Sequence, residues 1–287
     1  MQPDSKQFAD TLRQHFAAFS LSHPPKTLPV GRHKWTYLSC GRGDHVLLLL
    51  EGGGAVADID FQRILEFEAS RRVISVGYPV TATNMSDLVT GIAAVMEAEA
   101  VQKAVIYGHS LGGAVAQCFA RTYPNRVREL VLANIAVASR WRAAMARLLG
   151  VLLPVLPSGL LRKLMKAGLA RNLATMEAAE REFYTSFFSE MVDQYLTKEF
   201  LVNQFRCLLD FLNHYHFDSG DMTKWGGRIL ILEAADDRGW NVNERAAMRR
   251  LYPQAIVHTF AAGGHLVGFT KRREYDSVLR EFLGWRC

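Results

Sequence analysis

The sequence predicts an α/β fold in which a mostly parallel central sheet has helices on both faces and carries an inserted all-α cap. Short apolar segments alternate with amphipathic helical segments, which is typical of βαβ crossovers and a parallel sheet. One segment, HVLLLL at 45–50, is apolar throughout, as expected for a strand buried on both faces. The alternation stops near Ser139, gives way to helix-forming sequence until about Trp225, and then resumes.

The elements follow from the pattern in chain order. Residues 1–33 read as a helix followed by a proline-containing N-terminal arm. Strands are predicted where apolar runs or apolar–polar alternation end at turn residues: 34–39, 45–50, 72–79, 103–107, 127–136, 227–237 and 254–260. Helices are predicted where apolar residues recur at helical spacing: 57–69, 86–100, 111–124, 243–253 and 271–284. The α/β core therefore comprises 34–138 and 226–287, and the cap comprises 139–225.

Composition limits the classes of function. The chain has 287 residues, of which 49% are hydrophobic and 22% are charged, values that are ordinary for a globular enzyme. The net charge of +6 is modest for this length, so nucleic acid is not an expected partner. The sequence contains no P-loop motif and no HExxH motif, so no cofactor and no metal are expected.

The cysteines and the N-terminal segment predict a cytoplasmic protein. The cysteines show neither CxxC spacing nor clustering, so we interpret them as reduced thiols: Cys40, Cys118, Cys207 and Cys287. The opening MQPDSKQFADTLRQHF contains acidic side chains and no apolar centre, unlike a secretory signal. The longest uncharged run, 148–161, is too short to span a bilayer and contains two prolines.

The segment KAVIYGHSLGGAVAQ, residues 103–117, places Ser110 between two glycines where a strand turns into a helix. A nucleophile above the strand ends needs such a tight turn, and glycine at 108 and 112 removes side chains that would collide there. The following helix directs free N–H groups toward the serine, so the Leu111 N–H is an expected oxyanion donor. The alternative is a glycine-rich turn that only lets the helix pack closely, and the strand-to-helix context favours the nucleophile.

A serine hydroxyl needs a base, and His265 is the best placed of the nine histidines. It lies in FAAGGHLVGF, a loop that directly follows the last predicted strand and therefore lies at the carboxyl edge of the sheet. His109 adjoins the serine but is expected to point to the other side of the turn. It remains a lesser candidate.

A third group must hold the imidazole in the correct tautomer. Within the segment 227–237 the strand itself is expected at 229–233, so that Asp236 and Asp237 follow it, and either carboxylate could reach His265. The short turn after the strand favours Asp237, in which case Asp236 caps a turn or faces solvent.

With GHSLGG, EAADDRGW and AAGGHLVGF in this order, the chain from about 34 to 284 resembles the α/β-hydrolase superfamily. The resemblance implies a catalytic triad of Ser110, Asp237 and His265 beneath a helical cap. A weaker likeness to the maspardin-like group is carried by FQRIL, RVISVGYPV, the SLGG turn and RRLYPQAIVHTFAAGGH. That group includes members with incomplete triads, whereas this chain keeps its histidine.

The loop after 45–50 departs from the family pattern. The family usually has His-Gly there, followed by the residue that supplies the second oxyanion N–H, whereas this chain has Glu51 and then three glycines. Matching the glycines makes Gly53 the expected donor, with Gly54 as the alternative. A plain flexible loop is the other interpretation of these glycines.

Glu51 itself takes the place of the histidine, where an unpaired carboxylate would oppose negative charge on the substrate oxygen. Three resolutions are open: burial keeps it protonated, an arginine such as Arg238 pairs with it, or it accepts hydrogen bonds from loop N–H groups as a clamp. We favour the clamp over the other two and over a direct catalytic role.

The first half of the cap, from Arg140 to Arg171, contains seven basic residues and no acidic ones, together with the apolar run LLGVLLPVLPSGLL. This combination suits an acyl substrate with an anionic group, or contact with a membrane surface. A solvated basic helix face is the more ordinary explanation, so membrane contact is not the favoured one. The aromatic residues of 183–217 are expected to pack the cap and line an apolar pocket.

Three functions remain open. The favoured one is a serine hydrolase that cleaves an ester or thioester with a largely apolar acyl group through an acyl-enzyme on Ser110. The second is a lyase, a cyclase or a β-diketone hydrolase that uses the same triad, because the serine turn does not separate these chemistries. The third is a catalytically silent adaptor that binds a partner through the cap. The identity of the substrate and the oligomeric state do not follow from the sequence.

Overall fold

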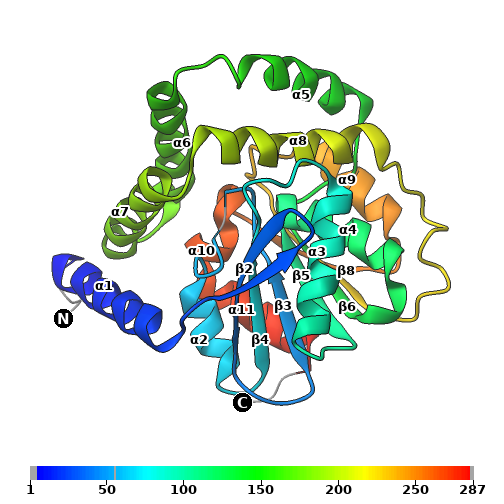
Figure 1. The fold of residues 1–287 in the computed structure, drawn as a ribbon, viewed down its shortest axis with the longest axis horizontal. Coiled ribbons are helices and arrows are strands. Elements are labelled where there is room, and N and C mark those ends of the chain that lie inside the picture. The colour runs from blue at the N-terminus through cyan, green and yellow to red at the C-terminus, as the bar shows by residue number, and fades with distance from the viewer. Residues whose placement is uncertain (1–4, 55, 285–287) are drawn as a thin grey trace.

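The structure is a computed structural model that describes residues 5–54 and 56–284. Within these residues the strands form one sheet in the order β1-β2-β4-β3-β5-β6-β7-β8. Strand β2 runs antiparallel to both β1 and β4, and the other neighbouring strands are parallel. The predicted α/β class and the mostly parallel sheet are therefore confirmed (Figure 1).

The strands are β1 (Lys26–Val30), β2 (His33–Cys40), β3 (Val46–Leu50), β4 (Arg72–Gly77), β5 (Ala104–His109), β6 (Val127–Ala133), β7 (Ile229–Ala234) and β8 (Ile256–Phe260). The helices of the core are α1 (Ser5–Ser22), α2 (Phe61–Glu68), α3 (Met85–Ala98), α4 (Leu111–Thr122), α9 (Val242–Leu251), α10 (Val267–Thr270) and α11 (Arg272–Phe282). Each strand and helix predicted for the core is present, with bounds shifted by a few residues at most of its ends.

The insertion between β6 and β7 is helical, as predicted. Its helices are α5 (Arg140–Leu152), α6 (Ser158–Asn172), α7 (Ala178–Gln194) and α8 (Lys198–His214). They lie over one end of the sheet in Figure 1, and side chains from α6 and α7 line the same cavity as Ser110. The cap therefore closes over the carboxyl edge, where open α/β sheets bind their ligands.

Apolar side chains on both faces of the sheet hold the layers together. In β3, Leu47 and Leu49 join the core on one face while Leu48 and Leu50 join the core on the other, and all four are fully buried. A strand covered on both sides cannot tolerate polar residues at either alternating position. This explains the uninterrupted leucines that predicted the strand.

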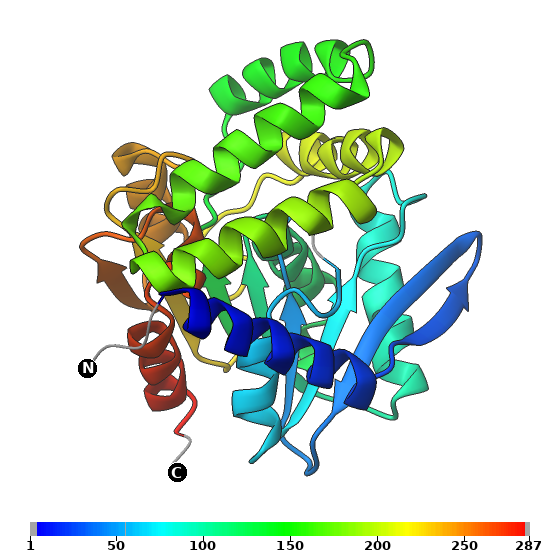
Figure 2. The ribbon, with the colours of Figure 1, turned by 90° about the vertical axis from the view of Figure 1, so that its left-hand side faces the viewer.

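The N-terminal arm differs from its prediction. Helix α1 is present, but it packs against both the core and the cap, with Phe16 4.9 Å from Phe187 between ring centroids (Figure 2). Residues 26–30 then form β1, an edge strand of the sheet. Pro29 lacks a backbone N–H, and an edge position tolerates it because one side of the strand has no partner.

Candidate active site

Ser110 occupies the turn between β5 and α4 and has φ 52° and ψ −119°, a strained conformation for a residue with a side chain. A Cβ at Gly108 would overlap the Gly112 carbonyl, and a Cβ at Gly112 would overlap the Leu50 carbonyl. Gly108 is therefore required for α4 to lie this close to β5, and Gly112 for α4 to lie this close to β3. This is the geometry that the two glycines predicted.

The structure brings the three residues of the predicted triad together. The Ser110 Oγ lies 2.9 Å from His265 Nε2. On the other side of the ring, His265 Nδ1 lies 3.1 and 3.0 Å from the two carboxylate oxygens of Asp237. An imidazole held in this way can take the serine proton at Nε2 while the carboxylate stabilises the resulting imidazolium.

Asp237 is fixed by further donors. Its Oδ2 accepts a hydrogen bond of 2.8 Å from Asn134 Nδ2, and its Oδ1 accepts one of 2.7 Å from the Gly239 N–H. Burial by itself would raise the pKa of Asp237, but the hydrogen bond and the charge of His265, together with the Asn134 and Gly239 donors, lower it overall. The carboxylate therefore stays ionised beside the histidine.

Asp236 has a different place from its neighbour. Its carboxylate accepts hydrogen bonds from the N–H groups of Gly263 (3.2 Å) and Gly264 (2.8 Å), directly before His265. It holds the loop that carries the histidine and does not contact the imidazole. The sequence expectation that this residue caps a turn agrees with this arrangement.

His109 is buried behind the triad. Its Nε2 donates a hydrogen bond of 2.9 Å to the His265 carbonyl. Burial lowers the pKa of His109 to about 3, and the neighbouring His265 adds to that effect. An imidazole with so low a pKa is a weak base, and the described hydrogen bond to Ser110 Oγ comes from His265, so His109 supports the position of the His265 loop.

The glycine loop after β3 passes over the serine. A Cβ at Gly52 would lie 3.4 Å from Ser110 Cβ, and a Cβ at Gly53 would lie 3.5 Å from the Leu111 side chain. Gly54 has φ +88° and lies against Leu196 of the cap. The loop thus places Gly53 beside Leu111, the residue that begins α4 and whose N–H lacks an intrahelical partner.

Glu51 is buried, and the favoured clamp is not what the structure shows. Its Oε1 accepts no hydrogen bond from the described residues. Burial raises the pKa of Glu51 to about 8. The nearby Asp60 carboxylate contributes to this rise, and the Arg63 guanidinium opposes it. Glu51 is therefore protonated near neutral pH, which removes the charge that would oppose an oxyanion.

The arginine nearest to Glu51 is also not the predicted one. Arg238 is exposed, whereas Arg63 of α2 is buried and lies 3.9 Å from Glu51 Oε1. Arg63 is already paired with Asp60 and with Asp276, and the distance from its Nε to Asp276 Oδ1 is 2.7 Å. The Arg63 guanidinium thus lies closer to the carboxylates of Asp60 and Asp276 than to Glu51. The Glu51 carboxyl is therefore neutral because it carries a proton.

A cavity of about 250 Å³ adjoins Ser110 and His265. Its walls are largely apolar side chains from the core and the cap: Ile59, Met165, Leu169, Phe188, Met191, Val192, Leu196, Leu266 and Phe269. Among the residues that the structure describes, no lysine or arginine lines it. The basic residues in the first half of the cap therefore do not provide a described counter-charge for a substrate bound there.

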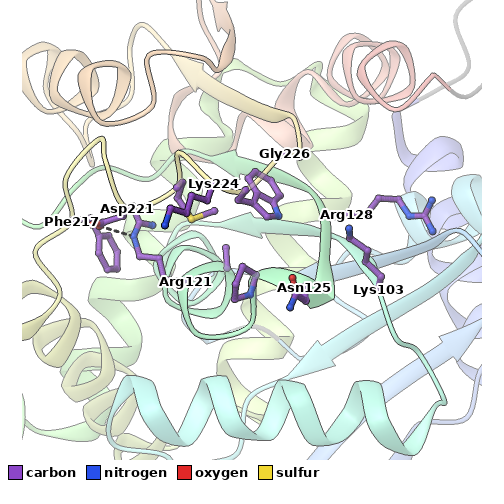
Figure 3. Close-up of a pocket in the computed structure, with 13 residues that line it drawn as sticks. Lys103, Arg121, Asn125, Arg128, Phe217, Asp221, Lys224 and Gly226 are labelled. Carbon is purple, nitrogen blue, oxygen red and sulfur yellow. Dashed lines mark hydrogen bonds and ion pairs between the residues drawn. The ribbon is translucent and has the colours of Figure 1, made fainter.

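A larger cavity, of about 850 Å³, lies elsewhere (Figure 3). It is lined by the carboxyl end of α4 and the segment before β7, and Arg121 pairs there with Asp221 at 3.0 Å. Ser110 lies at the opposite end of α4, so this cavity does not include the triad. Position relative to the reactive groups, and not volume, identifies the site.

Two polar residues of the site were missed in the sequence. Asn134 follows β6, has φ 45°, and donates to Asp237. Asn172 ends α6 in the cap, and its Oδ1 accepts a hydrogen bond of 3.4 Å from the His265 N–H. The position of Asn134 directly after a buried parallel strand was a usable signal, whereas nothing local distinguished Asn172.

Comparisons with known proteins agree with the fold. A family model described as the alpha/beta hydrolase fold matches residues 77–272. The chain is 26% identical over 256 residues to the 2-hydroxy-6-oxo-2,4-heptadienoate hydrolase of Pseudomonas putida, and the match covers 85% of this chain and 90% of that protein. It is 25% identical over 189 residues to the sn-1-specific diacylglycerol lipase of Danio rerio, and that match covers 64% of this chain and 58% of the lipase. A hydrolase structure from Pseudomonas aeruginosa PA01 superposes with a TM-score of 0.76 at 19% identity, covering 91% of this chain and 98% of the other.

Proposed function

Because the chain belongs to the alpha/beta hydrolase fold family, we propose that it is a serine hydrolase that cleaves an ester or thioester with a largely apolar acyl group. The observation that carries the proposal is the continuous series of hydrogen bonds from Ser110 through His265 to Asp237 at the wall of an apolar cavity. A serine activated in this way attacks an acyl carbon.

The proposed reaction has two halves. His265 Nε2 takes the proton from Ser110 as Oγ attacks, and the N–H groups of Leu111 and Gly53 stabilise the oxyanion. The imidazolium then protonates the leaving group, which leaves an acyl-enzyme. In the second half His265 removes a proton from water as its oxygen attacks the acyl carbon. The bond between that carbon and Ser110 Oγ then breaks, the imidazolium returns the proton to Oγ, and the carboxylic acid departs.

The cavity supports a neutral, short acyl group. Its volume of about 250 Å³ lies just below the roughly 300–1,000 Å³ of typical small-molecule sites. Burying an ionised carboxylate there would be costly without a cation to pair with it. This favours an ester or thioester over an anionic substrate.

A second candidate is cleavage of a C–C bond. The similarity to the P. putida protein, whose name is that of a dienoate hydrolase, supports this candidate. The same triad is compatible with either chemistry. The absence of a described lysine or arginine from the cavity wall distinguishes the candidates, because a dienoate carries a carboxylate that an apolar wall does not bind well.

The test combines a covalent probe with a substrate series. A fluorophosphonate probe is expected to label the wild-type protein and not Ser110→Ala, and the alanine variant is expected to lose roughly 10⁴–10⁶-fold in kcat. Hydrolysis of p-nitrophenyl butyrate is expected to exceed that of the palmitate ester and turnover of a 2-hydroxy-6-oxo-dienoate. Faster turnover of the dienoate would establish the second candidate. Absence of labelling would instead support a catalytically silent adaptor.

We also propose a cytoplasmic location. The thiols of Cys40, Cys118 and Cys207 are free, and burial raises the pKa of each, which suits thiols that stay reduced. Fractionation of cells that produce the full chain would test the location.

A further inference from the structure

The outer surface of the cap concentrates exposed apolar side chains. More than half of the large apolar side chains that are exposed in the described chain lie in α5, the following loop and the first turns of α6: Trp141, Met145, Leu148, Leu149, Val151, Leu152, Val155, Leu160 and Leu164. We call this set the cap face. An exposed apolar patch with such density marks an interaction site on a monomer.

Helix α5 directs an apolar stripe outward. Trp141, Met145, Leu148 and Leu152 recur at intervals of three or four residues and are exposed, with Trp141 65% and Leu148 57% accessible. The buried positions of the same helix are small residues such as Ala146, and α5 packs there against α8. In an ordinary surface helix the apolar stripe faces the core, whereas in α5 it faces solvent.

Helix α6 also exposes large apolar side chains, and it borders the site. Leu160 and Leu164 are exposed on its outer side, and Met165 and Leu169 line the cavity beside Ser110. Figures 1 and 2 show α5 at the outer edge of the cap, away from the sheet, while α6 runs from there toward the loop that carries His265. The cap face is therefore one helix thickness from the proposed acyl pocket.

Cations outnumber carboxylates around the cap face. Between residues 140 and 171 the sequence has seven basic residues and no acidic ones, and Lys163 is exposed between Leu160 and Leu164. Two of the seven are paired with carboxylates of other elements, Arg142 with Glu244 and Lys166 with Asp193. Apolar side chains with interspersed cations are the pattern of segments that lie in the interfacial region of a bilayer. No helix in the described part of the chain is long and apolar enough to cross a membrane.

We propose that the cap face binds the surface of a lipid bilayer that contains anionic lipids. The apolar side chains enter the region between headgroups and acyl chains, and the basic residues contact the headgroups. A second copy of the chain is a poorer occupant, because two cap faces would bring like charges together without an intervening carboxylate from either segment. An apolar ester that partitions into the bilayer would then reach the pocket through a cap already in contact with it.

The test is flotation of the full chain with vesicles. The protein is expected to float with vesicles of equal phosphatidylcholine and phosphatidylglycerol, to float much less with phosphatidylcholine alone, and to be released as NaCl is raised. Leu148→Ser combined with Leu164→Ser is expected to weaken binding about tenfold or more. The matched control combines Leu21→Ser with Ile256→Ser. Leu21 and Ile256 are 86% and 54% exposed and lie outside the cap face. The control variant is expected to float like the wild type.

Charge variants and an inactive variant complete the design. Lys163→Glu is expected to weaken binding to the anionic vesicles, whereas Lys34→Glu, at an exposed position on β2, is expected not to. Ser110→Ala is expected to float normally, so failure of the proposed hydrolytic function leaves this result unaffected. Retained hydrolysis of a water-soluble ester by the Leu148→Ser, Leu164→Ser variant would show that it folds.

The proposal is overturned if the wild type does not float with anionic vesicles, or if the cap-face and control variants lose binding equally. A dimer in lipid-free sedimentation that the Leu148→Ser, Leu164→Ser variant dissociates would also overturn it, because the cap face would then be a self-association surface.

Discussion

The backbone of Ser110 is held in its strained conformation from both sides. Its N–H donates to the Ala133 carbonyl at 3.0 Å, and its carbonyl accepts hydrogen bonds from Gly113 and Ala114 in the first turn of α4. Strain of this kind, roughly 1–3 kcal/mol for one residue, persists only where the surroundings over-determine it. The neighbouring strand and helix therefore fix the position of Ser110.

The two adjacent aspartates are expected to differ sharply in their effect on activity. Asp237→Asn should lower kcat by about 10⁴, because the amide favours the wrong tautomer of His265. Asp236→Asn should cost no more than about tenfold, since it only weakens the hydrogen bonds to Gly263 and Gly264. Steady-state kinetics of the two variants check this. Equal losses would mean that the third member of the triad lies elsewhere.

Glu51 gives a prediction about pH and stability. Its carboxyl ionises near 4.5 in an ordinary environment, whereas burial raises its pKa to about 8 in the folded protein. Between these values the folded state holds more protons than the unfolded state, so this group stabilises the protein at low pH and the stabilisation is lost as pH rises through 8. Glu51→Gln has no proton to lose and should match the wild type near pH 5.

Above pH 8 the Glu51→Gln variant should therefore be the more stable of the two, by about 1 kcal/mol or more. Urea unfolding of both proteins across this pH range measures the difference. The variant should also keep most of its activity, because a neutral amide resembles the protonated acid. Parallel stability profiles, or a loss of activity as severe as in Ser110→Ala, would contradict this account.

At the scale of elements, sequence reasoning succeeded where a local pattern has one physical cause. Apolar residues at every position of β3 require burial on both faces, and glycines around Ser110 require close approach of backbones. The three residues of the predicted triad could be found because each lies in the turn or loop that follows a strand. The pairing of Arg63 with Asp276 was not predictable, because it joins residues far apart in the chain through the packing of α2 on α11. The docking of α1 against α7 was missed for the same reason.

The close contact between α4 and β3 predicts the effect of one methyl group. Gly112→Ala should destabilise the protein by about 3 kcal/mol or more, because its Cβ would overlap the carbonyl of Leu50. Gly168→Ala is the control within α6, where a Cβ meets nothing within 4 Å. That change should stabilise the protein by about 0.5–1 kcal/mol. Thermal unfolding of both variants tests the pair, and a mild effect at 112 would show that the turn can relax.

For the whole molecule, the buried arginine joins two segments that lie about 200 residues apart in the sequence. Arg63 of α2 pairs with Asp60 and Asp276 and donates a hydrogen bond of 3.0 Å to the Gly268 carbonyl, at the base of the loop that carries His265. Its guanidinium also lies 4.9 Å from the Tyr275 ring centroid. The arginine thus ties α2 to α10 and α11 beneath the active site.

Removing this cation should be costly for the fold as a whole. Arg63→Met leaves Asp60 and Asp276 buried without their partner, and losses of about 3–5 kcal/mol in the free energy of unfolding are expected for such a change. Arg13→Met removes an exposed pair with Asp10 and should cost about 0–1 kcal/mol. Denaturant unfolding of the two variants decides the point. Similar small losses would mean that the buried carboxylates simply become protonated.

The position of the cap within the chain also sets the order in which the enzyme is completed during translation. Ser110 and its turn are synthesised before the cap, whereas Asp237 and His265 are synthesised after it. At ribosomal speeds of about 5–20 residues per second, the nascent chain carries the serine for on the order of ten seconds before either partner exists. A chain that stalls or is cut within the cap is therefore a fragment that has Ser110 without Asp237 and His265, and the three side chains can come together only after His265 has been synthesised.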